Sequence, residues 1–201
     1  MESGVRRRGR PPRASRAQVL GAARTQFLAG QRVDVTLIAR DLGVSRATIH
    51  RWFGSRDRLV GEVIANELEQ LIAVNRGRVR KRGAEGLLEL FDGINRTLSA
   101  SPPLRRLVEE EHAAALRLLT SSGGVVQPHA VALVQQLIDD EVTAGRYRPS
   151  VDPAVLAYAI VRLAEAFIYN DAAFGIRGDH ERLREIEAGL LGVPARRRRR
   201  R

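Results

Sequence analysis

Apolar residues recur every three or four positions along nearly the whole chain, whereas no stretch of useful length alternates apolar and polar residues. The first spacing is that of an amphipathic helix and the second that of a β-strand. Residues that can cap or end a helix separate the patterns. The sequence therefore predicts an all-α fold, with helices over about 15–29, 35–42, 45–53, 55–80, 84–99, 104–119, 127–144, 152–174 and 179–191, the sixth of them broken near the acidic residues 109–111.

The predicted helix over 152–174 is apolar on nearly all sides. A helix of this kind must be buried on all sides, and a small domain has little material to cover it. Two interpretations remain open: the helix belongs to an interface between two copies of the chain, or it is the central helix of a monomer.

Composition fits a soluble globular protein, with 201 residues of which 44% are hydrophobic and 28% charged. No apolar run is long enough to span a membrane, and no apolar segment follows the basic N-terminus as in a secretory signal. The absence of cysteine excludes disulfides and thiolate metal sites and fits a reducing compartment. We therefore expect a cytoplasmic protein.

Positive charge is concentrated near the start and at the end of the chain. The net charge is +11, residues 1–13 hold five Arg and one Glu, and residues 196–201 are all Arg. Residues 81–195 contain more acidic than basic side chains. This division predicts one part that faces a polyanion and one that does not. Whether the segment 196–201 is functional or only a solvated tail stays open.

Three residues have the spacing of a helix-turn-helix. Ala39 is small where two crossing helices approach, and Gly43, four positions later, permits a left-handed turn. Ile49 follows six positions after Gly43 and returns an apolar side chain to the first helix. The combination is typical of DNA-binding units, although helical hairpins elsewhere show similar spacing.

The surrounding stretch TLIARDLGVSRATIHRWFGSRDRLV, residues 36–60, resembles the signature of TetR-type transcriptional regulators. Two positions depart from that signature, since His50 and Arg56 stand where the family usually has a phosphate-binding Tyr and Lys. The resemblance implies a three-helix DNA-binding unit followed by a larger helical bundle. The matching elements are Ile38–Ala39, Gly43–Val44–Ser45, Thr48–Ile49–His50, Trp52–Phe53 and Ser55–Arg56–Asp57.

By this resemblance the helix over 45–53 lies in a DNA major groove. Arg46 can offer a bidentate fork to guanine, and the methyl groups of Ala47 and Thr48 can meet thymine methyls. Thr36 is expected to reach phosphate or a base edge, and Trp52 to pack its ring while its N–H reaches phosphate. The predicted contact residues of this unit are Thr36, Ser45, Arg46, Ala47, Thr48, His50, Arg51, Trp52 and Arg56.

A second DNA-binding motif lies in RRRGRPPR, residues 6–13. Its core Arg8-Gly9-Arg10-Pro11 resembles an AT-hook, an extended basic segment that lies in an A·T minor groove. Glycine removes bulk, proline enforces extension, and Arg8 and Arg10 seek the negative potential of a narrow groove. Disordered tails produce such runs by chance, so the prediction depends on the position just before a helix-turn-helix.

The expected organisation is a disordered basic arm over 1–13, a DNA-binding domain over 14–60, a ligand-binding and dimerisation domain over 61–195 and a basic tail over 196–201. The resemblance implies that the last two helices form the interface of a homodimer. Two copies of the recognition helix would then read a pseudo-palindromic operator.

The middle helices are expected to surround a cavity for a small apolar or amphiphilic effector, since they are rich in Leu, Val, Ile and Ala. Residues 162–192 are similar to QsdR-like actinobacterial regulators, which respond to lactone-type signals, so the resemblance implies a lactone or acyl compound. The candidate ligand-binding residues are Phe91, Asn95, His112, Leu116, Glu165, Tyr169 and Asn170.

The predicted function is therefore a repressor that leaves its operator when an effector binds, with no cofactor and no metal. Catalysis is not expected: Glu109-x-x-His112 has the spacing of half a di-iron site, but no second pair, nucleophile elbow or phosphate loop is present. The alternative is an architectural DNA-binding protein without an effector, which would need no cavity.

Overall fold

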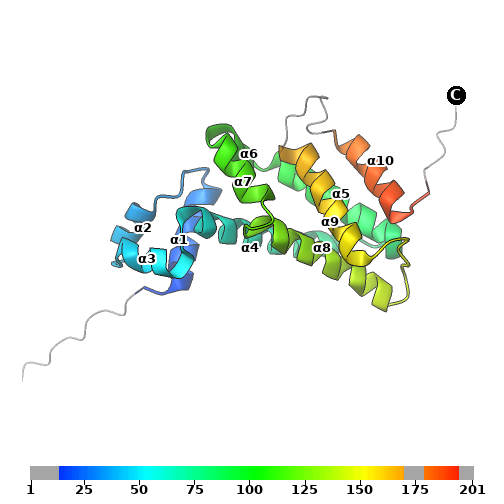
Figure 1. Cartoon of the computed structure of the whole chain (residues 1–201), viewed down its shortest axis with the longest axis horizontal. Helices are drawn as coiled ribbons and strands as arrows, with labels where there is room; N and C mark the ends of the chain where they lie inside the picture. Colours follow the sequence, from blue (N-terminus) through cyan, green and yellow to red (C-terminus); the bar gives the residue numbers. More distant parts are fainter. Residues whose placement is uncertain (1–13, 170–178, 195–201) are drawn as a thin grey trace, which may run out of the picture.

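A computed structural model of the chain describes residues 14–169 and 179–194, and these residues contain ten helices and no strand. The all-α prediction is confirmed. The molecule is elongated, with α1–α3 at one end, most of α5–α10 at the other and α4 running between them (Figure 1). The helices are α1 Arg16–Leu28, α2 Val35–Asp41, α3 Arg46–Phe53, α4 Arg56–Arg78, α5 Gly83–Ala100, α6 Pro102–Glu110, α7 His112–Thr120, α8 Val126–Thr143, α9 Pro153–Tyr169 and α10 His180–Leu191.

Several helices start directly after a Ser or Asp whose side chain caps them. Side-chain oxygens of Ser15, Asp34 and Ser45 accept hydrogen bonds from backbone N–H groups in the first turns of α1, α2 and α3. Ser55 and Asp179 do the same for α4 and α10. Such oxygens satisfy N–H groups that the start of a helix leaves unpaired, which explains why these starts are visible in the local sequence.

The predicted break near the acidic cluster lies at Glu111, whose backbone leaves the helical conformation with φ −127° and ψ 40°. α6 ends at Glu110 and α7 begins at His112. Glu109 and His112 thus stand on different helices, and both are exposed. The Glu-x-x-His spacing therefore does not place the two side chains on one helix face, as half of a di-iron site requires.

α4 is shared by two hydrophobic cores. In the first core, Leu59 from the start of α4 packs with Ile38 and Ile49 of the helix-turn-helix. In the second core, Ile72 from the far end of α4 packs with residues of α5, α8 and α9, among them Ile160. A displacement of α4 must therefore change the packing of both cores, at both ends of the molecule.

α9 is buried on one side only. Leu156 and Ile160 lie in the second core, whereas Val155 and Tyr158 are 60% and 48% exposed. Ile186 of α10 is exposed as well. The expectation of burial on every side thus fails within a single chain, because no described helix covers the outer face of α9. The predicted continuation of this helix to residue 174 lies outside the described residues.

No helix in the described part of the chain is both long and apolar enough to cross a lipid bilayer.

Candidate nucleic-acid interface and ligand cavity

The helix-turn-helix holds α3 with one face inward and one face outward. Gly43 adopts φ +65°, a left-handed conformation that favours glycine, and turns the chain between α2 and α3. Ile49 and Phe53 anchor the inner face of α3 in the first core. On the outer face Arg51 is exposed and forms no hydrogen bond or ion pair with any described residue. A cationic side chain in this state is available to an anionic partner. The exposed predicted contact residues of α3 are Arg46, Ala47, His50 and Arg51.

An open hollow lies between the start of α2 and α3. It brings Thr36 of α2 together with Arg46 and His50 of α3, although 14 positions separate the first of them from the last. Ala47 and Arg56 also line it. Five of the nine predicted contact residues therefore line one hollow, although they are scattered along the sequence.

Three predicted contact residues already have structural tasks. The Ser45 hydroxyl caps α3, lying 3.0 Å from the backbone nitrogen of Thr48 and 2.9 Å from the Thr48 hydroxyl oxygen. Trp52 is half-buried and packs against the first core. These side chains can touch DNA only with the atoms that capping and packing leave exposed.

Arg56 has a different role from the one its sequence position predicts. Its guanidinium donates to both carboxylate oxygens of Glu111, at 2.8 and 2.7 Å, and to the backbone oxygen of Val33 at 3.1 Å. Arg32 donates to the same carboxylate at 3.3 Å. These contacts hold the pKa of Glu111 below its ordinary value, chiefly through the hydrogen bonds from Arg56. In this structure Arg56 thus ties the unit of α1–α3, called here the DNA-reading unit after its predicted function, to the α6–α7 junction instead of facing outward to a phosphate.

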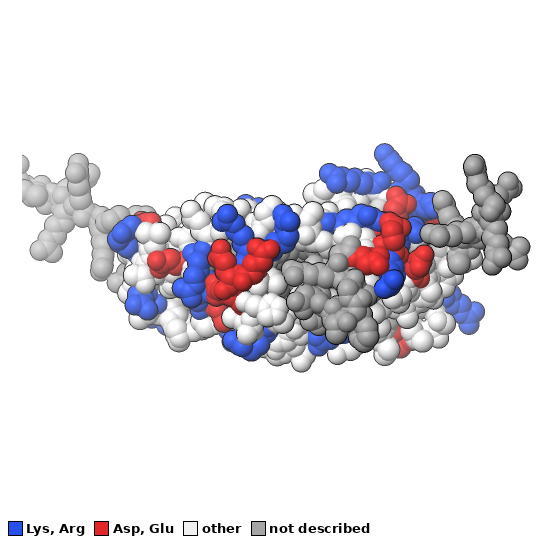
Figure 2. All heavy atoms as spheres, turned by 90° about the horizontal axis from the view of Figure 1, so that it is seen from above, with Lys and Arg blue, Asp and Glu red and all other residues white. Residues whose placement is uncertain are grey.

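Acidic side chains gather over the region of α6, with basic side chains on both sides (Figure 2). The Arg56–Glu111 pair belongs to this region, and Arg106 of α6 adds a hydrogen bond to the backbone oxygen of Gly30 at 3.1 Å. The junction of α6 and α7 is therefore joined to the DNA-reading unit by polar contacts.

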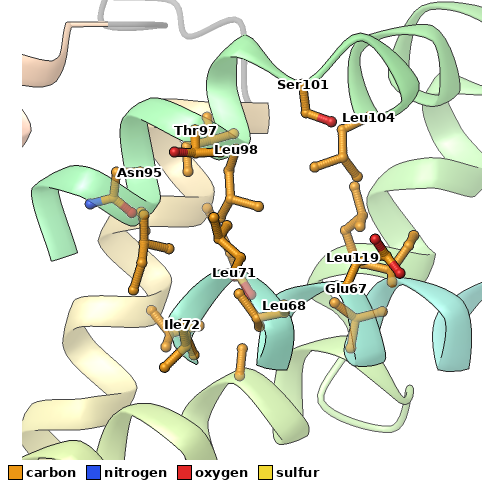
Figure 3. A pocket seen from close by; sticks show the side chains of 18 of the residues that line it. Glu67, Leu68, Leu71, Ile72, Asn95, Thr97, Leu98, Ser101, Leu104 and Leu119 are labelled. Atoms are coloured by element: carbon orange, nitrogen blue, oxygen red, sulfur yellow. The ribbon is translucent and has the colours of Figure 1, made fainter. Parts of the chain in front are cut away.

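A cavity of about 270 Å³ lies between the two ends of the molecule. Eight helices contribute to its wall, and α1 is one of them through Phe27 and Leu28. Leu71 of α4 and Leu98 of α5 point into it (Figure 3). The volume lies close to the lower limit of about 300 Å³ for ligand pockets. The wall is mostly apolar, as the sequence predicts for this region.

Four of the predicted ligand-binding residues lie in the cavity wall: Phe91, Asn95, Glu165 and Tyr169. His112 is exposed and Leu116 packs in the first core, so neither lines the cavity. The reason is the break at Glu111, which gives α7 its own orientation. Asn170 lies outside the described residues, as do Arg8 and Arg10 of the predicted DNA-binding arm and the basic segment 196–201.

Glu187 is the buried charged residue of the wall that the sequence prediction misses. It is 0% exposed, and its carboxylate accepts a hydrogen bond from the Asn95 side-chain nitrogen at 2.9 Å. Its other carboxylate oxygen has no hydrogen-bond partner among the described residues. The signal that points to its burial is spacing, since Leu183, Glu187 and Leu191 follow at four-residue intervals on the buried face of α10.

Burial raises the pKa of Glu187 from its ordinary value of 4.5 to about 7, while the hydrogen bond from Asn95 opposes the shift. Burial also raises the pKa of Glu165, against the hydrogen bond from Arg162. Removal from water disfavours the charged form, and neither partner fully compensates.

The pKa of Glu187 predicts how stability depends on pH. Between about pH 4.5 and 7 the folded protein keeps a proton on Glu187 that the unfolded chain has released, so the free energy of unfolding falls as pH rises through this window. Glu187→Gln removes this contribution. Urea unfolding at both ends of the window should show that the wild type loses up to about 3 kcal/mol more than the variant. The contributions of the other carboxylates are the same in both proteins and cancel in the comparison. An identical pH dependence of the wild type and the variant would contradict the raised pKa of Glu187.

Comparison with known proteins adds an independent finding. Residues 82–192 match the family described as "Tetracyclin repressor-like, C-terminal domain". The structure of the R. erythropolis transcriptional repressor QsdR from the TetR family is similar at 28% identity and a TM-score of 0.81, over 91% of this chain and 97% of that one. The TetR family repressor AlkX from Dietzia sp. strain DQ12-45-1b shares the fold at 22% identity and a TM-score of 0.59, over 90% and 99% of the two chains. No curated protein sequence matches.

Proposed function

Because the chain belongs to the TetR family of transcriptional regulators, we propose that it is a repressor that binds a pseudo-palindromic operator as a homodimer and leaves it when a small apolar or amphiphilic molecule fills the cavity. One observation carries the proposal. The same chain presents an outward-facing recognition helix and an apolar cavity whose wall includes α1 of the DNA-reading unit. The similarity to the repressor QsdR supports the direction of regulation.

The DNA contact of this proposal uses the outer face of α3. Arg46 and Arg51 supply cations that can read guanine, and Thr36 lines one hollow with Arg46. The arm, through Arg8 and Arg10, would add contacts in the adjacent minor groove. A dimer places two copies of α3 about 34–36 Å apart, the spacing of successive major grooves.

The homodimer of this proposal uses the outer faces of α9 and α10. Val155, Tyr158 and Ile186 are large apolar side chains that water reaches in the single chain. Covering such a face with a second copy removes apolar area from water without disturbing either core.

The effector would act through the contacts between the two ends of the molecule. Leu104 of α6 and Leu119 of α7 line the cavity, and the junction between these helices holds Arg56 through Glu111. A molecule that changes the packing of α6 and α7 therefore changes the support of the DNA-reading unit. By linkage, DNA must weaken effector binding by the same factor by which effector weakens DNA binding.

The experiment that tests the proposal starts from a library of random duplexes. Selection with the full chain should recover an inverted repeat, and titration should show tighter binding to it than to random duplex at physiological salt. A screen of lactones and acyl compounds should then find one that releases the recovered duplex. Equal affinity for both duplexes would end the repressor proposal. The cavity also argues against the alternative of an architectural DNA-binding protein, because such a protein binds no effector and needs no cavity.

Glu111→Gln should weaken the coupling between effector and operator. The substitution keeps the shape of the side chain but removes the charge that holds Arg56 and Arg32. Operator affinity without effector should change little, whereas the effector-induced loss, about 5–150-fold in coupled systems, should shrink several-fold. Fluorescence anisotropy with labelled operator, with and without the compound found in the screen, gives both numbers.

The matched control is Glu110→Gln, one residue earlier and exposed. It also removes one negative charge from the acidic cluster 109–111, but it leaves the hydrogen bonds of Arg56 intact. An unchanged effector response in Glu111→Gln would show that the signal does not pass through this junction.

A further inference from the structure

We propose that the α5–α10 end of the cavity recognises the head group of the effector with hydrogen-bond acceptors, the side-chain oxygen of Asn95 and the free carboxylate oxygen of Glu187. The cavity then takes an amphiphile that carries an O–H or N–H donor on an apolar chain, and it rejects carboxylates and phosphates. This inference rests on the proposed function, because it names the chemistry of the effector in the same cavity.

The first step is the burial of this polar pair. Asn95 is 5% exposed and Glu187 is not exposed at all, and both belong to the cavity wall. Burying a carboxylate and an amide costs free energy unless their polar atoms find partners. The contact between Asn95 and Glu187 satisfies one atom of each side chain. One side-chain oxygen of Glu187 remains without a partner among the described residues. Above its pKa of about 7 the carboxylate is ionised, and this oxygen is then an unused acceptor.

The second step is the orientation of the Asn95 amide. The carboxylate oxygen that faces it accepts a hydrogen bond, so the amide nitrogen must be the atom turned toward Glu187. The amide oxygen then has to face the other way. Figure 3 shows the nitrogen of Asn95 on the outer side and its oxygen on the side of the other labelled side chains. The atoms left for a ligand at this end are therefore acceptors.

The third step is the charge of the whole wall. Its ionisable side chains are the carboxylic acids Glu67, Glu165 and Glu187 together with Tyr169, and no Lys, Arg or His is among the described lining residues. Glu67 is paired with Arg24, and Glu165 lies 2.8 Å from the Arg162 guanidinium. An anionic head group would meet carboxylates without a compensating cation inside the cavity. A head group that donates a hydrogen bond would pair with an acceptor that has no donor among the described residues.

The rest of the wall fits an apolar chain. Figure 3 shows Leu98, Leu68 and Leu104 in succession away from Asn95, and Leu104 belongs to the same core as Phe27 of the DNA-reading unit. A molecule held by its head at Asn95 would thus extend its chain toward α1. The head group decides which molecule binds, and the chain reaches the part of the wall that borders the helix-turn-helix.

The test compares three compounds of equal chain length: n-decanol, n-decyl methyl ether and sodium decanoate. Isothermal titration of the full-length protein at a pH of about 8.5, where Glu187 is ionised, should show n-decanol binding about five- to tenfold more tightly than the ether, the difference expected for one hydrogen bond. Decanoate should bind more weakly than both. In Glu187→Gln an amide donor replaces the free acceptor, so the preference for alcohol over ether should shrink and decanoate should gain affinity.

Glu185→Gln is the matched control, since Glu185 is an exposed residue of the same helix, and it should retain the wild-type preferences. Asn95→Leu removes the other acceptor and should likewise reduce the preference for the alcohol. Circular dichroism and thermal melting establish that each variant is folded. Equal affinity of the wild type for alcohol and ether, or an unchanged preference in Glu187→Gln, would overturn the assignment of the head-group site.

These results are separable from failure of the proposed function. Tight binding of all three compounds with release of the operator would reject the acceptor site but keep the ligand-responsive repressor. Binding of none of them would overturn the proposal that donor-bearing amphiphiles occupy this cavity. Operator selectivity, measured without any compound, tests the DNA-binding function by itself.

Discussion

Replacing Arg51 by alanine should weaken binding of the dimer to its operator by about 2–6 kcal/mol, because each half-site loses a contact of about 1–3 kcal/mol. Arg51 is exposed on the outer face of α3 and has no partner among the described residues, so the substitution removes no internal contact. The thermal midpoint should therefore stay unchanged while operator affinity falls. Titration of labelled operator and of random duplex at the same salt concentration measures the effect and its specificity.

Arg105→Ala provides the control for charge, since Arg105 is an exposed arginine of α6, away from α3. It should leave the ratio between operator and random duplex unchanged. If Arg51→Ala lowers the affinity for both duplexes by the same factor, Arg51 contacts phosphate and not a base. If it lowers neither, α3 does not enter the groove with this face.

Val155→Glu should raise the dissociation constant of the homodimer at least about 100-fold, or about 3 kcal/mol. Val155 is 60% exposed in the single chain and lies on the outer face of α9. In a two-fold symmetric interface the substitution buries two carboxylates in an apolar surface without partners. Sedimentation equilibrium should show a monomer at concentrations where the wild type is a dimer, and operator binding should fall with it.

Val74→Glu is matched in chemistry and exposure, since Val74 is 53% exposed but lies on α4. It should leave the dimer intact. A dimeric Val155→Glu variant with wild-type affinity would show that the interface lies elsewhere, and the outer face of α9 would then need another explanation.

The parts of the fold that the sequence predicts well are those determined by neighbouring residues. Ser45 caps α3 through an atom three residues away, and Gly43 turns the chain by its own conformation. The break at Glu111 was likewise foreseeable from a local acidic run. Each of these depends on interactions within one helical turn, which a sequence displays directly.

The parts that the sequence does not predict depend on distant residues. Arg56 donates hydrogen bonds to the carboxylate of Glu111, 55 positions away, and the sequence near Arg56 does not indicate this partner. Asn95 and Glu187 are 92 positions apart, and only the packing of α10 on α5 brings them together. The sequence identifies Asn95 as a candidate ligand-binding residue but does not indicate that Glu187 is its partner. His112 does not line the cavity either: the break at Glu111 is local, but the orientation that α7 takes after the break depends on tertiary packing.

The position of α4 in both cores determines where two related regulators could be recombined into a chimera. A junction at residue 60 would cut through the first core, since Leu59 and Val60 pack there together with Val63 and Ile64. The ion pairs Arg16–Glu62 and Arg24–Glu67 extend the connection of α1 with α4 further along the helix. A chimera must therefore include the donor protein's α4 as far as Glu67 together with its DNA-reading unit. Because Glu67 lines the cavity, the transferred part of α4 must also pack against the cavity wall of the recipient.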